Sequence, residues 1–137
     1  MTLEVTSVNM RDCRLLELSI SAPIPEGNES PEAEIQLKND YDVIGSDGGN
    51  ITVRYRLSLS PQKGTYYTAS ATAIAAFSFP EDADDSEVDG YLRTFALMRI
   101  YDWLRAVLES SSAACILGPI RIPSDPPNLS SPFSADE

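Results

Sequence analysis

Apolar and polar residues alternate with a period of two between residues 13 and 79, which is the pattern of half-buried β-strands. The clearest stretch is 51–60, where every second residue is apolar and its neighbours are Thr, Arg or Ser. Similar alternation predicts strands over 14–20, 34–43 and 66–79. Turn-forming residues separate the last three strands, so we expect hairpins and an antiparallel meander with one apolar face.

The last predicted strand carries small residues on its apolar face. Ala69, Ala71, Ala73 and Ala75 stand at alternate positions, and Ser or Thr occupies most of the positions between them. Alanine is a weak strand former, so a helix is the competing interpretation of 69–76. The period-two spacing of the hydroxyl residues favours a strand. Its small side chains would let another element pack close to the sheet.

Residues 89–114 have the period of an α-helix with an unusually wide apolar face. At 100° per residue the apolar side chains occupy an arc of about 180°, whereas a stripe of about 100° is typical of a surface helix. Tyr91, Phe95 and Met98 fall outside this arc. Leaving the excess in water costs several kcal/mol at about 25 cal/mol per Å². We therefore expect self-association or a hydrophobic ligand, unless loops of the chain cover the excess. The arc comprises Leu92, Ala96, Leu97, Ile100, Tyr101, Trp103, Leu104, Val107 and Leu108.

An acidic loop is predicted over residues 80–88, just before this helix. Pro80 ends the last strand, and acids are favourable near a helix N-terminus. The acids do not fit a calcium loop, because position 6 counted from Asp82 is Glu87 and position 12 is Arg93. A charged loop without a metal is therefore the expectation.

A proline-rich extended tail is predicted over residues 115–137. Gly118 and Pro119 stop the helix, and further prolines follow them. With a sheet over 13–79 and one helix after it, the chain 1–137 is expected to be a single α+β domain, in which the long helix packs on one face of the sheet.

Charge excludes several classes of partner. Ten Lys and Arg stand against 21 Asp and Glu, so the net charge is −11 at pH 7. This balance argues against binding of nucleic acid or of an anionic membrane, because both need clustered cations. No apolar run reaches the about 18 residues of a membrane span. Residues 1–6 have no basic or apolar leader pattern, so a cytoplasmic location is expected.

Catalytic chemistry has few candidate residues. The chain has no histidine, which removes Ser-His-Asp and Cys-His systems and histidine metal ligands. Its two cysteines, Cys13 and Cys115, are expected to be buried free thiols, with one long-range disulfide as the alternative. Asp40 and Asp42 could share one side of a strand, but two carboxylates alone are typical of a solvated strand end. We expect no enzyme and no cofactor.

The order of these parts resembles the SecB family of bacterial chaperones. Four antiparallel strands, an acidic break, one long helix and a Gly-Pro exit follow one another over residues 13–123. SISAP at 19–23 resembles the end of the family's first strand. AAFSF at 75–79 resembles the end of its last strand. ILGPIRIP at 116–123 resembles the crossover segment that follows the helix.

The resemblance implies a holdase, which binds unfolded or aggregation-prone polypeptide in hydrophobic grooves without ATP. It also implies a dimer or tetramer, with helices packed between dimers. The client-binding candidates are residues of the helix and of the crossover segment. They are Trp103, Val107, Leu117, Ile120 and Ile122.

The resemblance also bears on a second partner, a translocase or an antitoxin. Glu17 corresponds to one of the acids with which export members of the family contact the translocase, on the outer face of the sheet. Ser21 and Ser70 stand where further such acids are expected. This departure favours a SecB-like chaperone outside the export pathway, a group that includes members attached to toxin–antitoxin systems. The alternative function is an acidic inhibitor or adaptor that sequesters a basic partner, which the net charge motivates.

Overall fold

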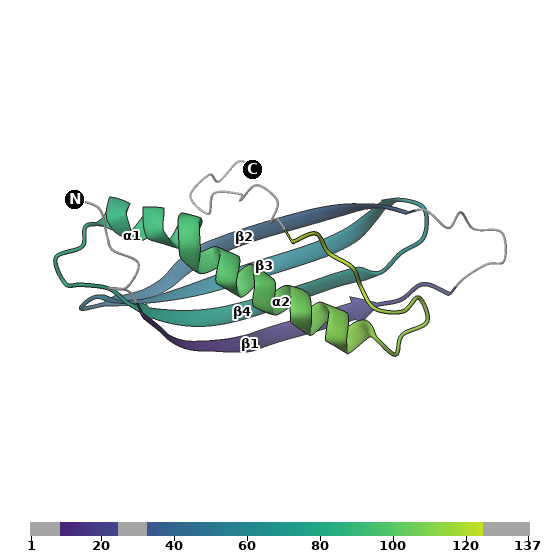
Figure 1. The fold of residues 1–137 in the computed structure, drawn as a ribbon, viewed down its shortest axis with the longest axis horizontal. Helices are drawn as coiled ribbons and strands as arrows, with labels where there is room; N and C mark the ends of the chain where they lie inside the picture. The colour runs from purple at the N-terminus through teal and green to yellow at the C-terminus, as the bar shows by residue number, and fades with distance from the viewer. Residues whose placement is uncertain (1–8, 25–32, 125–137) are drawn as a thin grey trace.

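The computed structural model describes residues 9–24 and 33–124 and consists of one antiparallel sheet with a helical rod across one face (Figure 1). The strands are β1 (Asn9–Ser21), β2 (Glu34–Asp47), β3 (Asn50–Lys63) and β4 (Thr68–Ser78). The rod consists of α1 (Asp85–Tyr91), η2 (Leu92–Ala96) and α2 (Leu97–Ser112) in direct succession. The predicted four-stranded sheet with one long helix is confirmed. The proline-rich part of the tail from residue 125 onwards lies outside the described residues.

The order of the strands is not that of the expected meander. β2, β3 and β4 follow one another as hairpins, but β1 pairs with β4 and the order is β1-β4-β3-β2. The meander prediction is therefore wrong for β1. The stretch between β1 and β2 is too long and proline-rich for a tight hairpin, so nothing local forces these two strands to pair. As a result β1 and β2 are the two edges of the sheet.

The helix begins four residues earlier than predicted. Asp84 accepts a hydrogen bond from the backbone N–H of Glu87 at 2.8 Å, and the Glu87 side chain accepts one from the Asp84 N–H at 3.1 Å. This reciprocal capping box satisfies two N–H groups that the first turn would leave unpaired. The predicted acidic loop therefore ends at Asp84, and residues 85–88 are helical. The helix also ends at Ser112 and not at residue 114.

A wide turn, η2, explains the burial of Tyr91. Tyr91 falls outside the apolar arc of a uniform helix, yet it is 5% exposed. The π-type turn at Leu92–Ala96 contains more residues than an α-turn. It therefore rotates the residues of α1 about the helix axis relative to those of α2, compared with a uniform helix. Phe95 and Met98 also fall outside the arc, and they are 42% and 41% exposed.

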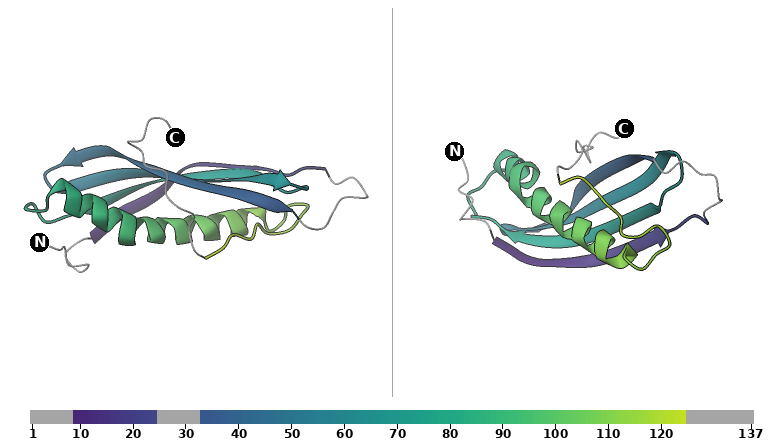
Figure 2. Two further views of the ribbon diagram at one scale, coloured as in Figure 1. Left: turned by 90° about the horizontal axis from the view of Figure 1, so that it is seen from above. Right: turned by 45° about the vertical axis from the view of Figure 1, so that its right-hand side comes forward.

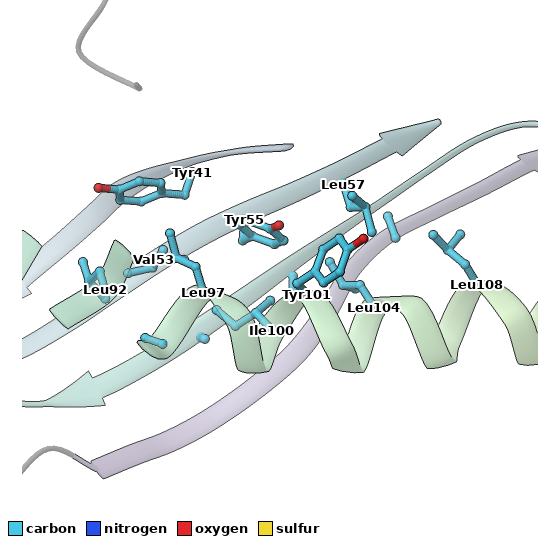
Figure 3. Close-up of a cluster of buried hydrophobic side chains, with 14 of the residues drawn as sticks. Tyr41, Val53, Tyr55, Leu57, Leu92, Leu97, Ile100, Tyr101, Leu104 and Leu108 are labelled. Carbon is cyan, nitrogen blue, oxygen red and sulfur yellow. The ribbon is translucent and has the colours of Figure 1, made fainter. Parts of the chain in front are cut away.

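The core lies between the helical rod and the central strands. The row of alanines on β4 is buried, and α2 packs across β4 and β3, as the small side chains predicted. Figure 3 shows helix side chains such as Leu97, Ile100 and Leu104 directed at Val53, Tyr55 and Leu57 of β3. The rod and the segment after it cover one face, and no other helix or strand of residues 9–24 and 33–124 lies on the opposite face of the sheet (Figure 2).

Candidate functional site

A crossover segment, residues 113–124, follows α2 and turns back over the sheet towards β2 (Figure 1). It has no regular structure of its own, so its backbone polar groups need partners elsewhere. The partners include the side-chain hydroxyls of three tyrosines and one serine.

The tyrosines at the end of the β3–β4 connection hold the middle of the crossover segment. Tyr67 donates a hydrogen bond to the carbonyl of Gly118 at 2.5 Å and accepts one from the N–H of Leu117 at 3.1 Å. Tyr66 accepts one from the N–H of Arg121 at 3.1 Å. Gly118 has a φ of 78°, which is strained for residues with a side chain. The turn at the Gly-Pro pair is therefore fixed against the end of the sheet.

Side chains of α2 also bind the crossover segment, at positions after its Gly-Pro turn. Ser112, fully buried, donates to the Leu108 carbonyl at 2.6 Å and accepts from the N–H of Ile120 at 2.7 Å. Further along, Tyr101 donates to the carbonyl of Pro123 at 2.6 Å, and Arg121 forms an ion pair with Glu109. These contacts fasten the segment to α2 along about three turns of the helix.

A cavity of about 570 Å³ lies between α2 and the crossover segment. Its walls carry two ion pairs, Arg105 with Asp102 and Arg121 with Glu109. Ile120 and Ile122 contribute apolar surface. We call it the crossover cavity. Its lining residues are Asp102, Arg105, Ala106, Glu109, Ile120, Arg121, Ile122 and Ser124.

The opposite edge of the helix faces a second apolar region. Leu15 and Leu18 of β1 pair with Ala73 and Ala71, whose side chains are buried beneath the helix, so the two leucines point to the same side of the sheet. They remain 40% and 37% exposed, because α2 packs mainly on β3 and β4 and covers β1 only in part.

Trp103 and Val107 belong to this second region. At 100° per residue they lie on the side of the buried stripe opposite to Tyr101, which bonds the crossover segment. Their edge of the helix is therefore the one turned towards β1. Trp103 is 37% exposed and Val107 is half-buried. We call Leu15, Leu18, Trp103 and Val107 the β1-side surface.

The structure divides the predicted client-binding residues between these two places. Trp103 and Val107 lie on the β1-side surface, whereas Ile120 and Ile122 line the crossover cavity. Leu117 lies on the crossover segment and is 36% exposed. Ile120 is only 1% exposed, because the bond between its N–H and Ser112 draws it into the core. Its side chain belongs to the core in this structure, and its contact with a client stays a prediction.

Glu17 is exposed on the outer face of the sheet, where it pairs in register with Thr72. In the next strand Arg56 stands opposite Thr72, and Arg54 stands two pairs further along, on the same face. The outer face near Glu17 therefore mixes acids with arginines. Arginines therefore interrupt the acids on this face. A basic tail would bind most strongly to an unbroken acidic face.

The two thiols are half-buried and free. Burial, followed by the negative charge of Asp12, raises the pKa of the Cys13 thiol above its usual range. A thiol with a raised pKa is protonated at neutral pH and is a poor nucleophile. Within the described ranges, no three His, Cys, Asp or Glu side chains lie close enough together to hold a metal ion. No helix in that part of the chain is long and apolar enough to cross a membrane.

Sequence reasoning missed the hydroxyl groups that fasten the crossover segment. Tyr66 and Tyr67 continue the alternation of a strand, and Ser112 belongs to a serine run that predicts only a weak helix end. The proline-rich segment itself indicates that such partners exist, because its backbone N–H and C=O groups need hydrogen bonds once it lies on a sheet.

Comparison with solved structures shows a SecB-like fold. The Mycobacterium tuberculosis SecB-like chaperone Rv1957, in complex with a ChAD peptide from the HigA1 antitoxin Rv1956, superposes with a TM-score of 0.68. The match covers 88% of each chain at 20% sequence identity. A Streptococcus agalactiae protein of unknown function matches more weakly, with a TM-score of 0.42, 9% identity, and coverage of 85% of this chain and 96% of the other. No protein-family model and no curated protein matches the sequence.

The buried serine provides a test of how the crossover segment is held. Ser112→Ala leaves the Ile120 N–H without its partner, and an unsatisfied buried donor costs about 1–3 kcal/mol. We expect chemical denaturation to show that loss of unfolding free energy, together with faster hydrogen exchange at Ile120. The matched control is Ser111→Ala, an exposed neighbour on the same turn. Equal stability of the two variants would contradict this assignment.

Proposed function

We propose that the chain is an ATP-independent chaperone that holds unfolded or aggregation-prone polypeptide, including a segment of an antitoxin. The observation that carries the proposal is the SecB-like fold, shared over 88% of the chain with a SecB-like chaperone that binds an antitoxin peptide. At 20% identity the likeness concerns the fold. The function is argued from the surfaces of this chain.

Exposed apolar side chains support the proposal. Trp103, Leu15 and Leu18 are each between 37% and 40% exposed and face one side of the molecule. Exposed apolar side chains gathered on one side of a protein are typical of sites where another polypeptide binds. We propose that client segments contact Trp103, Val107, Leu117 and Ile122, with Ile120 supporting the crossover segment from below.

An antitoxin-type client fits the chain better than a translocase. The outer sheet face that carries Glu17 also carries Arg54, which forms an ion pair with Asp42. Mixed charges of this kind would weaken the attraction of a basic translocase tail. Glu17 stays a candidate contact for a basic partner on this face.

The lone tryptophan provides a test of client binding. We expect the protein to suppress aggregation of a heat-unfolded model protein without nucleotide, and Trp103→Ser to need about ten times more protein for the same effect. Loss of one large apolar contact weakens binding by about 1–2 kcal/mol, and 1.4 kcal/mol is tenfold. The aggregation is followed by light scattering.

The control for this assay is Thr94→Ser, at an exposed position on the same rod. No suppression by the unmodified protein at several-fold molar excess would contradict the chaperone proposal. Suppression that disappears in high salt would instead favour an acidic adaptor, because screening weakens electrostatic binding far more than apolar binding.

Self-association is the second part of the proposal. β1 is an edge strand with one neighbour, and Leu15 and Leu18 on its helix side stay 40% and 37% exposed among the described residues. An uncovered apolar edge favours pairing with another chain. A second copy paired along β1 would cover Leu15 and Leu18 of both protomers and leave Trp103 and Val107 to the client.

The mass of the particle tests this second part. Size exclusion coupled to light scattering is expected to give a dimer or tetramer at micromolar concentration. Leu15→Lys, which puts a charge on the uncovered side of β1, should shift the mass towards the monomer. Asp12→Lys, on the opposite face of the same strand, is the control. A monomer for the unmodified protein would contradict self-association.

A further inference from the structure

A cleft of about 680 Å³ lies at the end of the molecule opposite to the crossover segment's turn, between the β2–β3 hairpin and the start of the rod. Val43 and Ser46 come from β2, Ile51 from β3, and the remaining residues from α1 and η2. The hairpin and α1 lie side by side at the left end of Figure 1. The other lining residues are Asp85, Ser86, Val88, Asp89, Leu92 and Arg93.

The floor of this cleft is apolar. Ile51 and Leu92 are buried at 8% and 1% exposure, and Val88 is partly buried against the same core. At its mouth Val43 is 37% exposed. The backbone is irregular there, with a shift of register between Val43 and Gly45. The cleft can therefore shelter an aliphatic chain.

One carboxylate of the rim is already satisfied. Asp89 accepts a hydrogen bond from Tyr41 and another from Arg93 Nε at 3.1 Å. The Arg93 guanidinium also lies 5.5 Å from the centre of the Tyr41 ring. Burial, followed by the contact with Asp89, raises the pKa of Tyr41 to about 12, so the phenol stays a donor at neutral pH. Asp89 is thus committed to holding the rod on β2.

The second carboxylate of the rim, Asp85, forms none of the ion pairs found among residues 9–24 and 33–124. It stands in the strongest concentration of acids on the chain, and the hairpin tip adds one more. Two arginines lie at this end, Arg93 and Arg11, and Arg11 donates to Asn50 at 3.1 Å. The acids are Asp47, Glu81, Asp82, Asp84, Asp85, Glu87 and Asp89.

The combination of an apolar floor and a net negative rim selects one kind of occupant. Lysine and arginine side chains carry an aliphatic stem and a cationic head, so the stem can cover apolar surface while the head meets a carboxylate. We infer that the cleft binds an arginine or lysine of an extended client segment, with the stem on Val43, Ile51 and Val88 and the head at Asp85. This inference rests on the proposed function, because the segment belongs to the client.

The site would set which segments the chaperone prefers. The crossover cavity carries two internally paired arginines, so it offers no net negative charge to a cation. The α1 cleft would therefore add a preference for segments in which a basic residue lies beside apolar ones. Charge complementarity of this kind affects specificity and association rate more than affinity.

The test compares two labelled peptides by fluorescence anisotropy. Both are twelve-residue peptides of Leu, Val, Ser and Gly; one carries two arginines, and its twin carries two citrullines, which keep the shape and lose the charge. We expect the unmodified protein to bind the arginine peptide about three to five times more tightly, which is the upper part of the range of an exposed ion pair. Asp85→Asn should remove that difference.

Matched variants make the result specific to the cleft. Asp40→Asn removes the same charge from the outer face, opposite Arg56, and should leave the preference for arginine intact. Ser46→Trp fills the cleft without changing charge or the helix cap, and should remove the preference as well. Circular dichroism checks that each variant is folded.

The outcomes separate this inference from the proposed function. Equal binding of the two peptides by the unmodified protein overturns the inference and leaves the chaperone proposal standing. An arginine preference that survives both Asp85→Asn and Ser46→Trp also overturns it. If the unmodified protein binds neither peptide, the proposed function fails and the inference fails with it.

Discussion

The apolar face of the helical rod is wider than the part of the sheet that it covers, and the other features of the structure follow from this difference. The continuous helix from Asp85 to Ser112 crosses the two central strands, β3 and β4, and buries its stripe on their small and aromatic side chains. It covers the edge strand β1 only in part: Cys13 and Ile20 pack against the core, whereas Leu15 and Leu18 stay exposed. Apolar residues of both elements therefore stay partly in water, where each costs free energy in proportion to its exposed area.

The chain covers part of this excess with its own backbone, by turning the crossover segment back across the sheet. A segment without regular structure can lie there only if its polar groups are satisfied. The hydroxyls of Tyr66, Tyr67, Tyr101 and Ser112 supply the partners. The fastening is on one side of the rod only. The β1-side surface has no equivalent cover among the described residues, and this asymmetry is the physical basis of the proposed binding of client or copy.

Much of the architecture follows from sequence patterns that reflect local structure. The period-two alternation and the helical arc predict the sheet and the rod, and the alanines of β4 predict where the rod packs. The partner of β1 could not be predicted, since pairing across the sheet depends on a long connection with no local preference. The start of the helix was misplaced, because Asp84 and Glu87 were interpreted by their charge and not as a capping box.

The candidate site is less visible in the sequence than the fold. The sequence names Trp103 and Val107 as client-binding candidates beside residues of the crossover segment, and helical geometry places these two on the opposite edge of the rod from the crossover cavity. The π-type turn at Leu92–Ala96 also changes which residues face the sheet, and Tyr91 is buried as a result. A helical wheel assumes the same rotation at every residue, so it cannot represent such a turn.

The emission of Trp103, the chain's single tryptophan, tests most directly whether the β1-side surface is left for another polypeptide to cover. The protein is titrated with an unstructured, tryptophan-free polypeptide rich in Leu and Val, and separately concentrated without it. The account predicts a shift of the emission maximum to shorter wavelength in at least one of these titrations, as Trp103 leaves water. An emission maximum that stays constant in both, while the added polypeptide is bound, would contradict it.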